Sequence, residues 1–456
     1  IADSSGVITI ASSVLTTADI NGGTVDGAVI GGASAAAGTF TTANATTVDT
    51  TNIEVTNLKA KDGTAAGSIA DSSGVITIAS SVLTTADING GTVDGITSLS
   101  MPSGTVNIQA TYPTGTSNVG FGSGTFENIE AGGTLNTAMG VNALQDLTTG
   151  DNNTAIGYQT ALNATTASGT IAVGSQAIGL GITTGNYNTA IGYQSGYDLT
   201  SGTYNFFGGA QAGANATTAT GTTALGYIAL GTGVLTGNYN TAVGYQAGQD
   251  LTSGTYNFFI GYQAALNATT ADYTIAIGRE AIGLGVLTGD YNIALGQFAG
   301  YDLTSGANNF FAGSYAGFNV TTGIYNISQG YQAGYTATTG SYNIFQGFGA
   351  GYNATTVSST IAIGRNAIGL GVLTGADNVA IGYQAGYDLT SGTYNIFSGY
   401  QAGANVTTGV GNVFSGYQAG EFATTSNYGI AIGYNAIGLG VLTGTDNTAI
   451  GRGAGA

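Results

Sequence analysis

The sequence predicts an all-β, repetitive solenoid: a parallel β-roll or β-helix of 17–18 residues per coil, with about 20 coils. The first observation is a short phrase, Asn-Thr/Val-Ala-Ile-Gly-Tyr-Gln-Ser/Ala-Gly, whose clearest copies occupy residues 188–196 and 378–386. The second is its regular return, because self-similarity at a fixed short period is typical of stacked repeats. The third is composition. Eighty glycines, two prolines and 6% charged residues are unusual for a helical or mixed globular domain.

A glycine stands at the centre of the phrase, and its recurrence gives the length of each coil. The central glycines are Gly140, Gly157, Gly174, Gly192, Gly209, Gly226, Gly244, Gly261, Gly278, Gly296, Gly313, Gly330, Gly347, Gly364, Gly382, Gly399, Gly416, Gly433 and Gly451. Thirteen of the eighteen intervals are 17 residues long and five are 18. The phrase that begins at Asn118 is predicted to be an irregular first coil.

Three classes of turn alternate along the coils. One carries aspartate, as in residues 197–202, one carries Asn-Ala-Thr-Thr, as in residues 215–218, and one carries Gly-Leu-Gly, as in residues 282–289. Each 18-residue interval goes with a turn of the Gly-Leu class. The classes form a 52-residue superrepeat for three cycles, and two later cycles are lengthened to 86 and 69 residues. The solenoid therefore grows by whole coils.

The first 95 residues form a different module. Residues 1–27 recur identically as residues 69–95, a repeat of 68 residues, and short Val/Ile/Thr stretches such as 7–10 predict strands. No stretch is apolar enough for a monomeric core, so we expect an extended, β-rich, trimeric fibre shaft. Residues 96–117 hold both prolines and are predicted to be a neck before the β-roll at 118–456. Because the chain starts without methionine, we expect it to be a piece of a longer protein.

Composition and charge exclude several functions. The chain has no histidine, cysteine or tryptophan, and 23 acidic residues against five basic ones give a net charge of −18. Binding to nucleic acid needs a basic patch that neutralises phosphates, so no nucleic-acid partner is expected. No apolar run is long enough to cross a membrane, and we expect no membrane insertion of this segment. An acidic surface rich in Thr and Asn suits a protein exposed on a virion or outside a cell.

The pattern within a coil predicts which positions are buried. With the asparagine of the phrase as position 0, position 2 is Ala in most coils and Phe in six, and position 3 is usually Ile, Val or Leu. Neighbouring residues of a strand point to opposite faces, so both faces of this strand are apolar. A thin solenoid has one interior. We therefore predict that the other face packs against neighbouring chains.

The position-0 asparagines are predicted to form an internal amide ladder. The coils that lack the asparagine have Thr170, Thr222, Thr274, Thr360 and Gly429 in its place. All five belong to the Gly-Leu class.

These residues carry two resemblances. The phrase Asn-Thr-Ala-Ile-Gly-Tyr-Gln-Ala-Gly resembles the head repeat of trimeric autotransporter adhesins, which implies left-handed parallel β-rolls side by side in a homotrimer over residues 118–456. The coils here are several residues longer than the adhesin coil. Residues 19–32 and 36–42 resemble the shaft repeats of bacteriophage tail fibres. That family implies trimers that project from the virion and contact the host surface.

Candidate chemistry is limited to acidic residues in turns. The aspartates of one turn class are Asp146, Asp198, Asp250, Asp302 and Asp388. They could be calcium ligands, but most successive members lie three coils apart, about 14 Å, and Asp also begins ordinary turns. The carboxylate pairs to test for glycoside hydrolysis are Glu127 with Glu130 and Asp272 with Glu280. Neither pair stands out, so we expect no catalytic, metal or cofactor site and no enzymatic activity.

Other surface residues leave two interpretations open. Arg279-Glu280 and Arg365 fall where tyrosine is common in other coils, and they form either a surface or inter-chain ion pair or a ligand contact. The tyrosines after the central glycine either pack between chains, which we favour, or form an aromatic strip for glycans. They include Tyr158, Tyr193, Tyr245, Tyr262 and Tyr383. Ice binding is disfavoured, because position 1 mixes Thr with Ile, Phe and Val.

We therefore expect a structural or adhesive fibre segment of a phage virion, in a tail or capsid fibre, that projects a receptor-binding region at the virion surface. The expected partners are further copies of the chain in a homotrimer, other fibre or baseplate proteins, and a host glycan or protein receptor. The receptor-binding residues are not identified by the sequence. The alternative is a bacterial trimeric surface adhesin or an extracellular filament protein.

Overall fold

The chain divides into two units, residues Ile1–Pro102 and Ser103–Ala456. The computed structural model describes the backbone of residues 58–59, 65–69 and 76–77 in the first unit, and residues 118–129, 132–438 and 440–455 in the second. The first unit contains a small antiparallel sheet of β1 (Leu58–Lys59), β2 (Ala65–Ile69) and β3 (Ile76–Thr77). The rest of the predicted shaft and the predicted neck at 96–117 lie outside the described residues.

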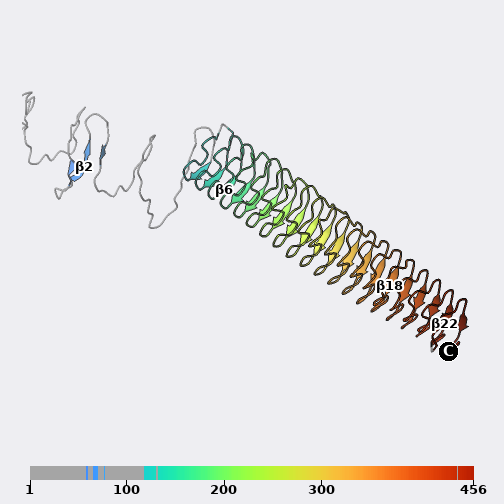
Figure 1. Cartoon of the computed structure of the whole chain (residues 1–456). Coiled ribbons are helices and arrows are strands. Elements are labelled where there is room, and N and C mark those ends of the chain that lie inside the picture. The colour runs from blue at the N-terminus through green and yellow to red at the C-terminus, as the bar shows by residue number, and fades with distance from the viewer. Residues whose placement is uncertain are drawn as a thin grey trace, which may run out of the picture. The chain divides into compact units, whose positions relative to one another are not determined.

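The second unit is a parallel β-solenoid in which each coil contributes one strand of three residues (Figure 1). In order, the strands are β4 (Val119–Phe121), β5 (Thr137–Met139), β6 (Thr154–Ile156), β7 (Ile171–Val173), β8 (Thr189–Ile191), β9 (Phe206–Gly208), β10 (Thr223–Leu225), β11 (Thr241–Val243), β12 (Phe258–Ile260), β13 (Ile275–Ile277), β14 (Ile293–Leu295), β15 (Phe310–Ala312), β16 (Ile327–Gln329), β17 (Ile344–Gln346), β18 (Ile361–Ile363), β19 (Val379–Ile381), β20 (Ile396–Ser398), β21 (Val413–Ser415), β22 (Ile430–Ile432) and β23 (Thr448–Ile450).

Each strand pairs in parallel with the strand of the next coil, residue for residue. Nineteen such pairings join β4 to β23 within the described solenoid. The predicted all-β solenoid is therefore confirmed, with about nineteen turns. The phrase at Asn118 is its first coil, because β4 pairs with β5 in the same register as the later strands.

The central glycine ends each strand in a conformation that residues with a Cβ atom rarely adopt. Its φ lies between +121° and +139° throughout the described coils. Packing closes the same position to side chains: a Cβ atom on Gly209 would lie 2.6 Å from the carbonyl oxygen of Gly226 in the next coil. The glycine therefore both turns the chain out of the strand and allows two coils to meet backbone to backbone.

The buried position-0 asparagines form the predicted amide ladder. The Asn257 side chain Nδ2 donates to the carbonyl oxygen of Ala271 in its own coil, at 2.6 Å, and to Asn240 Oδ1 in the preceding coil, at 3.0 Å. Asn257 Oδ1 accepts the backbone N–H of Thr274 in the following coil, at 2.9 Å. One side chain thus braces its own coil and joins it to both neighbours.

The ladder is interrupted where threonine replaces asparagine. The backbone N–H of Thr170 still donates to Asn153 Oδ1 at 2.9 Å, but Thr170 Oγ1 is buried without a hydrogen-bond partner. In the following coil, Asn188 Nδ2 donates to the carbonyl oxygens of Gly185 and Gly202, at 3.1 and 2.8 Å. The interior amide ladder therefore does not link the Thr170 coil to the coil after it.

The interior holds large and small side chains that compensate each other. Position 2 points inward in every strand from β5 to β23, whereas positions 1 and 3 point outward. Phe207 at position 2 lies between two glycines at position 8, because Cβ atoms on Gly196 and Gly213 would lie 2.8 and 2.5 Å from its ring. Coils of the Gly-Leu class have Ala at position 2 and a large residue at position 8, such as Ile178 or Leu230. In these coils a large residue at position 2 therefore goes with a small residue at position 8, and a small residue at position 2 goes with a large one at position 8.

We predict that Gly209→Ala destabilises the solenoid by about 3 kcal/mol or more, because strain at this φ adds to overlap with the next coil. Thermal unfolding followed by circular dichroism measures the change. Gly440→Ala is the control, since a Cβ atom there meets no neighbour within 4 Å. Equal melting temperatures for the two variants would contradict the role assigned to the central glycine.

We predict that Asn257→Ala costs about 2–4 kcal/mol, because it leaves the buried Thr274 N–H and the Ala271 carbonyl group without partners. Denaturant unfolding gives the free-energy change. Asn353→Ala, at the half-buried position 10, removes only the side-chain hydrogen bond to the Leu370 carbonyl oxygen and should cost much less. A similar decrease in the free energy of unfolding for both variants would contradict the larger stabilising role that we assign to the interior ladder.

Candidate functional site

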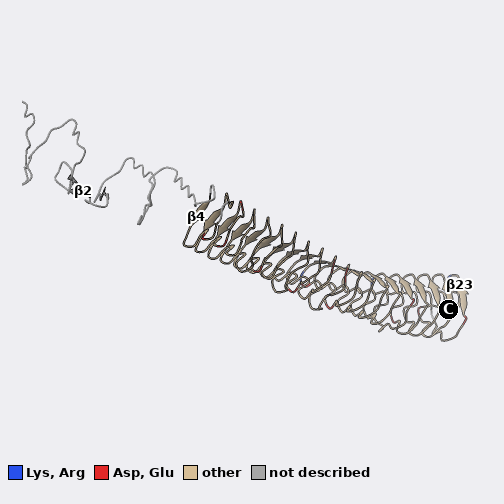
Figure 2. Cartoon of the chain, turned by 90° about the horizontal axis from the view of Figure 1, so that it is seen from above, with Lys and Arg blue, Asp and Glu red and all other residues tan. Residues whose placement is uncertain are grey.

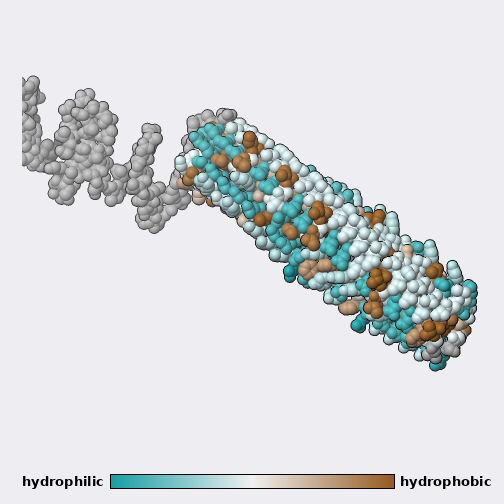
Figure 3. All heavy atoms as spheres, in the orientation of Figure 1, coloured by the Kyte–Doolittle hydropathy of each residue, from teal (hydrophilic) through white to brown (hydrophobic). Residues whose placement is uncertain are grey.

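The outer face of the sheet carries the second apolar set that the sequence predicts. Phe206 at position 1 is 38% exposed, and Ile191 and Ile381 at position 3 are 45% and 43% exposed. We call the outward residues at positions 1 and 3 of β4–β23 the outer strip. With parallel strands about 4.8 Å apart, it is about 95 Å long. Figure 3 shows hydrophobic side chains in separate groups along one face of the rod. Exposed apolar patches of several hundred Å² are common at interaction sites, so the outer strip is the candidate interaction surface of the described solenoid.

Two rows of tyrosines precede and follow the strands, at positions 16 and 5. In the first row, Tyr256 and Tyr273 stack with ring centroids 5.0 Å apart, and in the second Tyr400 and Tyr417 stack at 4.9 Å. The coil repeat brings identical side chains into register, as in other stacked β-structures. The tyrosines predicted at position 5 therefore stack within one chain, and their faces are partly occupied by their neighbours.

Arg279 and Arg365 replace tyrosine in the position-5 row. The Arg279 Cζ atom lies 5.8 Å from the ring centroid of Tyr262 and 5.6 Å from that of Phe298. Arg365 lies in the same way between the rings of Phe348 and Tyr383. Cation–π contacts thus continue the row. Arg279 Nε also pairs with Glu280 Oε1 at 3.0 Å, so the predicted ion pair forms on the surface between sequence neighbours.

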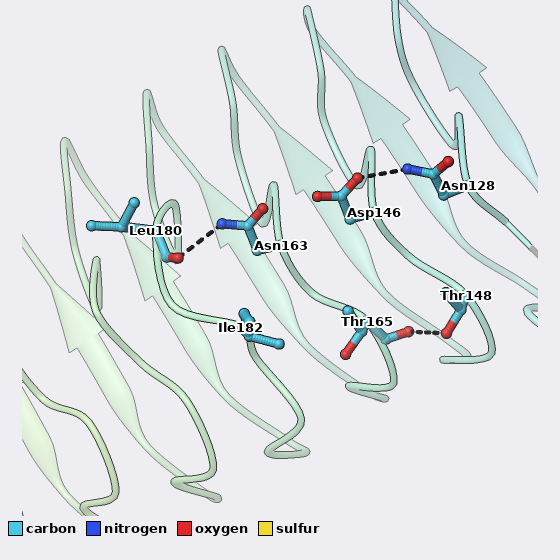
Figure 4. A pocket seen from close by; sticks show the side chains of 7 residues that line it. All are labelled: Asn128, Asp146, Thr148, Asn163, Thr165, Leu180 and Ile182. Atoms are coloured by element: carbon cyan, nitrogen blue, oxygen red, sulfur yellow. Dashed lines mark hydrogen bonds between the residues drawn. The ribbon is translucent and has the colours of Figure 1, made fainter.

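The aspartates of the first turn class lie at position 10, in a row with the Asn and Leu side chains of the other classes. Figure 4 shows the start of this row, where Asn128, Asp146, Asn163 and Leu180 line a hollow of about 590 Å³. Asn128 Nδ2 donates to Asp146 Oδ1 at 2.7 Å. Among the described residues, no three acidic side chains gather as a metal site would require. The aspartates of this row are separated from one another by coils that have no carboxylate at position 10.

The proposed carboxylate pairs have separate partners. Glu127 accepts a hydrogen bond from Gln145 Nε2, and Glu130 lies outside the described residues. Asp272 accepts hydrogen bonds from the backbone N–H and the hydroxyl group of Thr255, at 2.6 and 2.9 Å. Glu280 pairs with Arg279. Asp272 and Glu280 are thus each held by a different group.

Exposed apolar residues of the longer coils are a surface feature that was not predicted from the sequence. In the coil of Thr170, Leu180 is 56% and Ile182 is 65% exposed, and Leu284 and Val286 repeat this arrangement at 57% and 56%. The longer turn pushes these side chains outward before the chain returns to the interior at a buried residue such as Leu287. The extra residue of each 18-residue interval was the sequence feature from which these exposed side chains could have been predicted.

No protein-family model, curated protein or solved structure matches this chain. The described residues contain no helical segment with the length and hydrophobicity that a membrane span requires. The function must therefore be inferred from the surfaces of the solenoid.

Burial raises the pKa of the Asp198, Asp302 and Asp388 carboxyl groups above their usual value. A carboxyl group with a raised pKa in the folded state favours folding when it is protonated. Its contribution to stability is lost as the pH rises from the unfolded pKa, about 4, through the folded value.

We predict that the triple variant Asp198→Asn, Asp302→Asn, Asp388→Asn melts at a higher temperature than the parent at pH 7. Solvent screening limits the gain to about 0.5 kcal/mol per site. Thermal melts at a series of pH values test this, and the difference should vanish near pH 3, where the parent carboxyl groups are protonated. A difference that is constant with pH would rule out the titration of these groups as its cause.

Proposed function

We propose that this chain is a homotrimeric, structural and adhesive fibre segment of a phage virion, in which three solenoids pack side by side through their outer strips. The observation that carries the proposal is the apolar character of the outer strip. A solenoid with one interior has no need of Ile, Val and Leu on the outside of its strands. Covering such side chains stabilises an assembly by about 1.5–3 kcal/mol for each one that becomes fully buried.

The charge distribution supports packing through this face. None of the residues of β4–β23 is charged. The acidic residues are scattered along the solenoid, as Figure 2 shows, and lie outside the strands. Three copies can therefore meet through their outer strips without desolvating a strand charge, which would be costly.

The dimensions support a spacing role. A solenoid about 95 Å long, whose coils repeat in register, keeps the segments at its two ends a fixed distance apart. The resemblance of residues 19–32 to tail-fibre shaft repeats favours a virion, where host attachment uses such a spacer. The resemblance of the coil phrase to adhesin heads favours the alternative, a trimeric adhesin of a bacterial surface.

We predict that sedimentation equilibrium of the full chain gives a mass near three times 44.9 kDa. Glutamate at Ile156, Ile191, Ile277 and Ile381 together should reduce the mass toward that of one chain, since each carboxylate would be buried without a partner. The control places glutamate at Thr166, Ser201, Ser305 and Ser391, which are exposed in turns. A monomeric parent, or a trimer that tolerates glutamate in the outer strip, would overturn the proposed assembly.

A further inference from the structure

The charged residues next to the outer strip are separated by sign. We call the residues directly before position 0, such as Tyr256, the entry row, and the residues at position 5, such as Tyr400, the exit row. The two rows lie at opposite ends of the three-residue strands. The charged members of the entry row are Asp377 and Asp446, and those of the exit row are Arg279, Arg365 and Arg452. In the described coils, the entry row therefore carries only negative charges and the exit row only positive ones.

The aspartates of the entry row are presented in the same way as its tyrosines. Asp377 and Asp446 have φ values of 60° and 58°, close to the 59° of Tyr394 in the same row. Both aspartates are exposed. Neither side chain has an ion pair or a hydrogen bond in the part of the chain that the structure describes. Each carboxylate is therefore open to a group from outside the chain.

Two arginines of the exit row also lack a carboxylate partner. The Arg365 Cζ atom lies 5.5 and 6.0 Å from the ring centroids of Phe348 and Tyr383. The Arg452 Cζ atom lies 5.5 Å from the ring centroid of Tyr434. These cation–π contacts hold the guanidinium groups and leave the N–H groups at their edges to bind a carboxylate. Among the described residues, neither arginine has a carboxylate within ion-pair distance.

The unpaired arginines and aspartates match in height along the rod. Arg452 and Asp446 flank the same strand, β23, and so belong to the same coil. Arg365 follows β18 and Asp377 precedes β19, the strand of the next coil, so these two residues are one coil apart, about 4.8 Å along the axis.

Arg279 shows the complementary case. It pairs with Glu280 of its own chain, and the entry row at the corresponding heights has Tyr273 and Tyr291. In the described coils, an aspartate thus occurs in the entry row only beside an arginine that has no carboxylate of its own.

The matching residues cannot meet within one chain. Asp446 and Arg452 are six residues apart along a largely extended segment, which places them on the order of 15–20 Å from each other, at the two ends of the strand. The complementary charges can therefore be joined only by a second copy of the chain.

The symmetry of a ring of parallel rods brings the two rows together. Copies related by rotation about an axis parallel to the rod stand at the same height, and each contact joins different sides of the two copies. The exit row of one copy then lies beside the entry row of the next. In an antiparallel pair that packs face to face, like rows meet and the coils of one end face those of the other. Opposite charges are thus paired by parallel packing alone.

We propose that Arg365 and Arg452 of one copy form ion pairs with Asp377 and Asp446 of the neighbouring copy, and that these pairs fix the parallel, in-register packing of the solenoids. The inference rests on the proposed function, in which copies pack through their outer strips. It names the charged contacts that border this packing. Electrostatic complementarity of this kind suppresses wrong orientations and fixes register.

Sedimentation equilibrium of the full chain tests the pairs by charge reversal. Arg365→Glu/Arg452→Glu places carboxylates beside the aspartates of the neighbouring copy, so the association constant should fall about tenfold or more. Adding Asp377→Arg/Asp446→Arg to the same chain restores opposite charges with the sides exchanged, and it should recover most of the loss. Because this fourfold variant still lacks both arginines at position 5, the recovery cannot come from their ring contacts.

Ser391→Glu/Thr408→Glu is the matched control, because it adds two carboxylates to exposed turns in the same part of the rod. It should leave the association nearly unchanged, and circular dichroism shows whether each variant keeps the parent fold. The loss caused by charge reversal should become smaller at high salt, which screens exposed charges.

Cysteine variants test the register directly, since the chain has no cysteine of its own. Asp446→Cys/Arg452→Cys, treated with a short bismaleimide, should give covalently linked trimers. Asp446→Cys alone should not be linked, because like rows do not meet. Tyr325→Cys/Arg452→Cys should not be linked either, since its entry-row cysteine lies seven coils away from the other cysteine.

The inference is overturned by a trimer that does not respond to charge reversal, by a loss that the fourfold variant does not recover, or by linkage through Asp446→Cys alone. Each of these results leaves the trimeric assembly in place. A parent chain that sediments as a monomer refutes the proposed assembly, and the inference with it.

Discussion

The whole solenoid depends on the close approach of backbones at the central glycine. Strands of three residues are too short to form a stable sheet by themselves, so each must be held in register by the neighbouring coils. At Gly209 the unusual φ and the nearby carbonyl oxygen of Gly226 leave no room for a Cβ atom. The asparagine ladder then connects consecutive coils from the inside. Since both constraints recur once per coil, an insertion preserves them only when it adds a complete coil.

The same constraints leave the outside free to vary. Folding needs the asparagine, the inward residue at position 2, the central glycine and the buried residues at positions 7, 8 and 11. Positions 5, 6, 9 and 10 lie outside this set, and it is there that Arg279, Arg365 and the aspartates of the first turn class appear. Repeat proteins commonly carry function in this way, on surface positions of a scaffold whose stability is local.

The coil length, the amide ladder and the two apolar faces of each strand could be predicted from the sequence, because each depends on residue spacing within one coil. The packing of Phe207 between Gly196 of the preceding coil and Gly213 of its own coil could not, since it depends on how successive coils stack across the interior. The contacts of the Phe298 ring with Tyr301 and Phe318 could not be predicted either, because they depend on how two successive coils stack. Tyrosines at position 5 were the more regular aromatic signal in the sequence.

Because the amide ladder is interrupted, the strength of the link between neighbouring coils is expected to vary along the rod. Between the threonine coils, and between Thr360 and Gly429, the asparagines form blocks of two, two, four and three coils. After each threonine coil the link through the interior amides is missing, and the next coil is joined by backbone hydrogen bonds, by packing and by other side chains such as Thr183, whose hydroxyl group donates to the Leu199 carbonyl oxygen. A rod under tension is therefore expected to be weakest directly after its threonine coils. The longest unbroken block runs from Asn292 to Asn343, and its four coils are the longest stretch that is joined continuously from the inside.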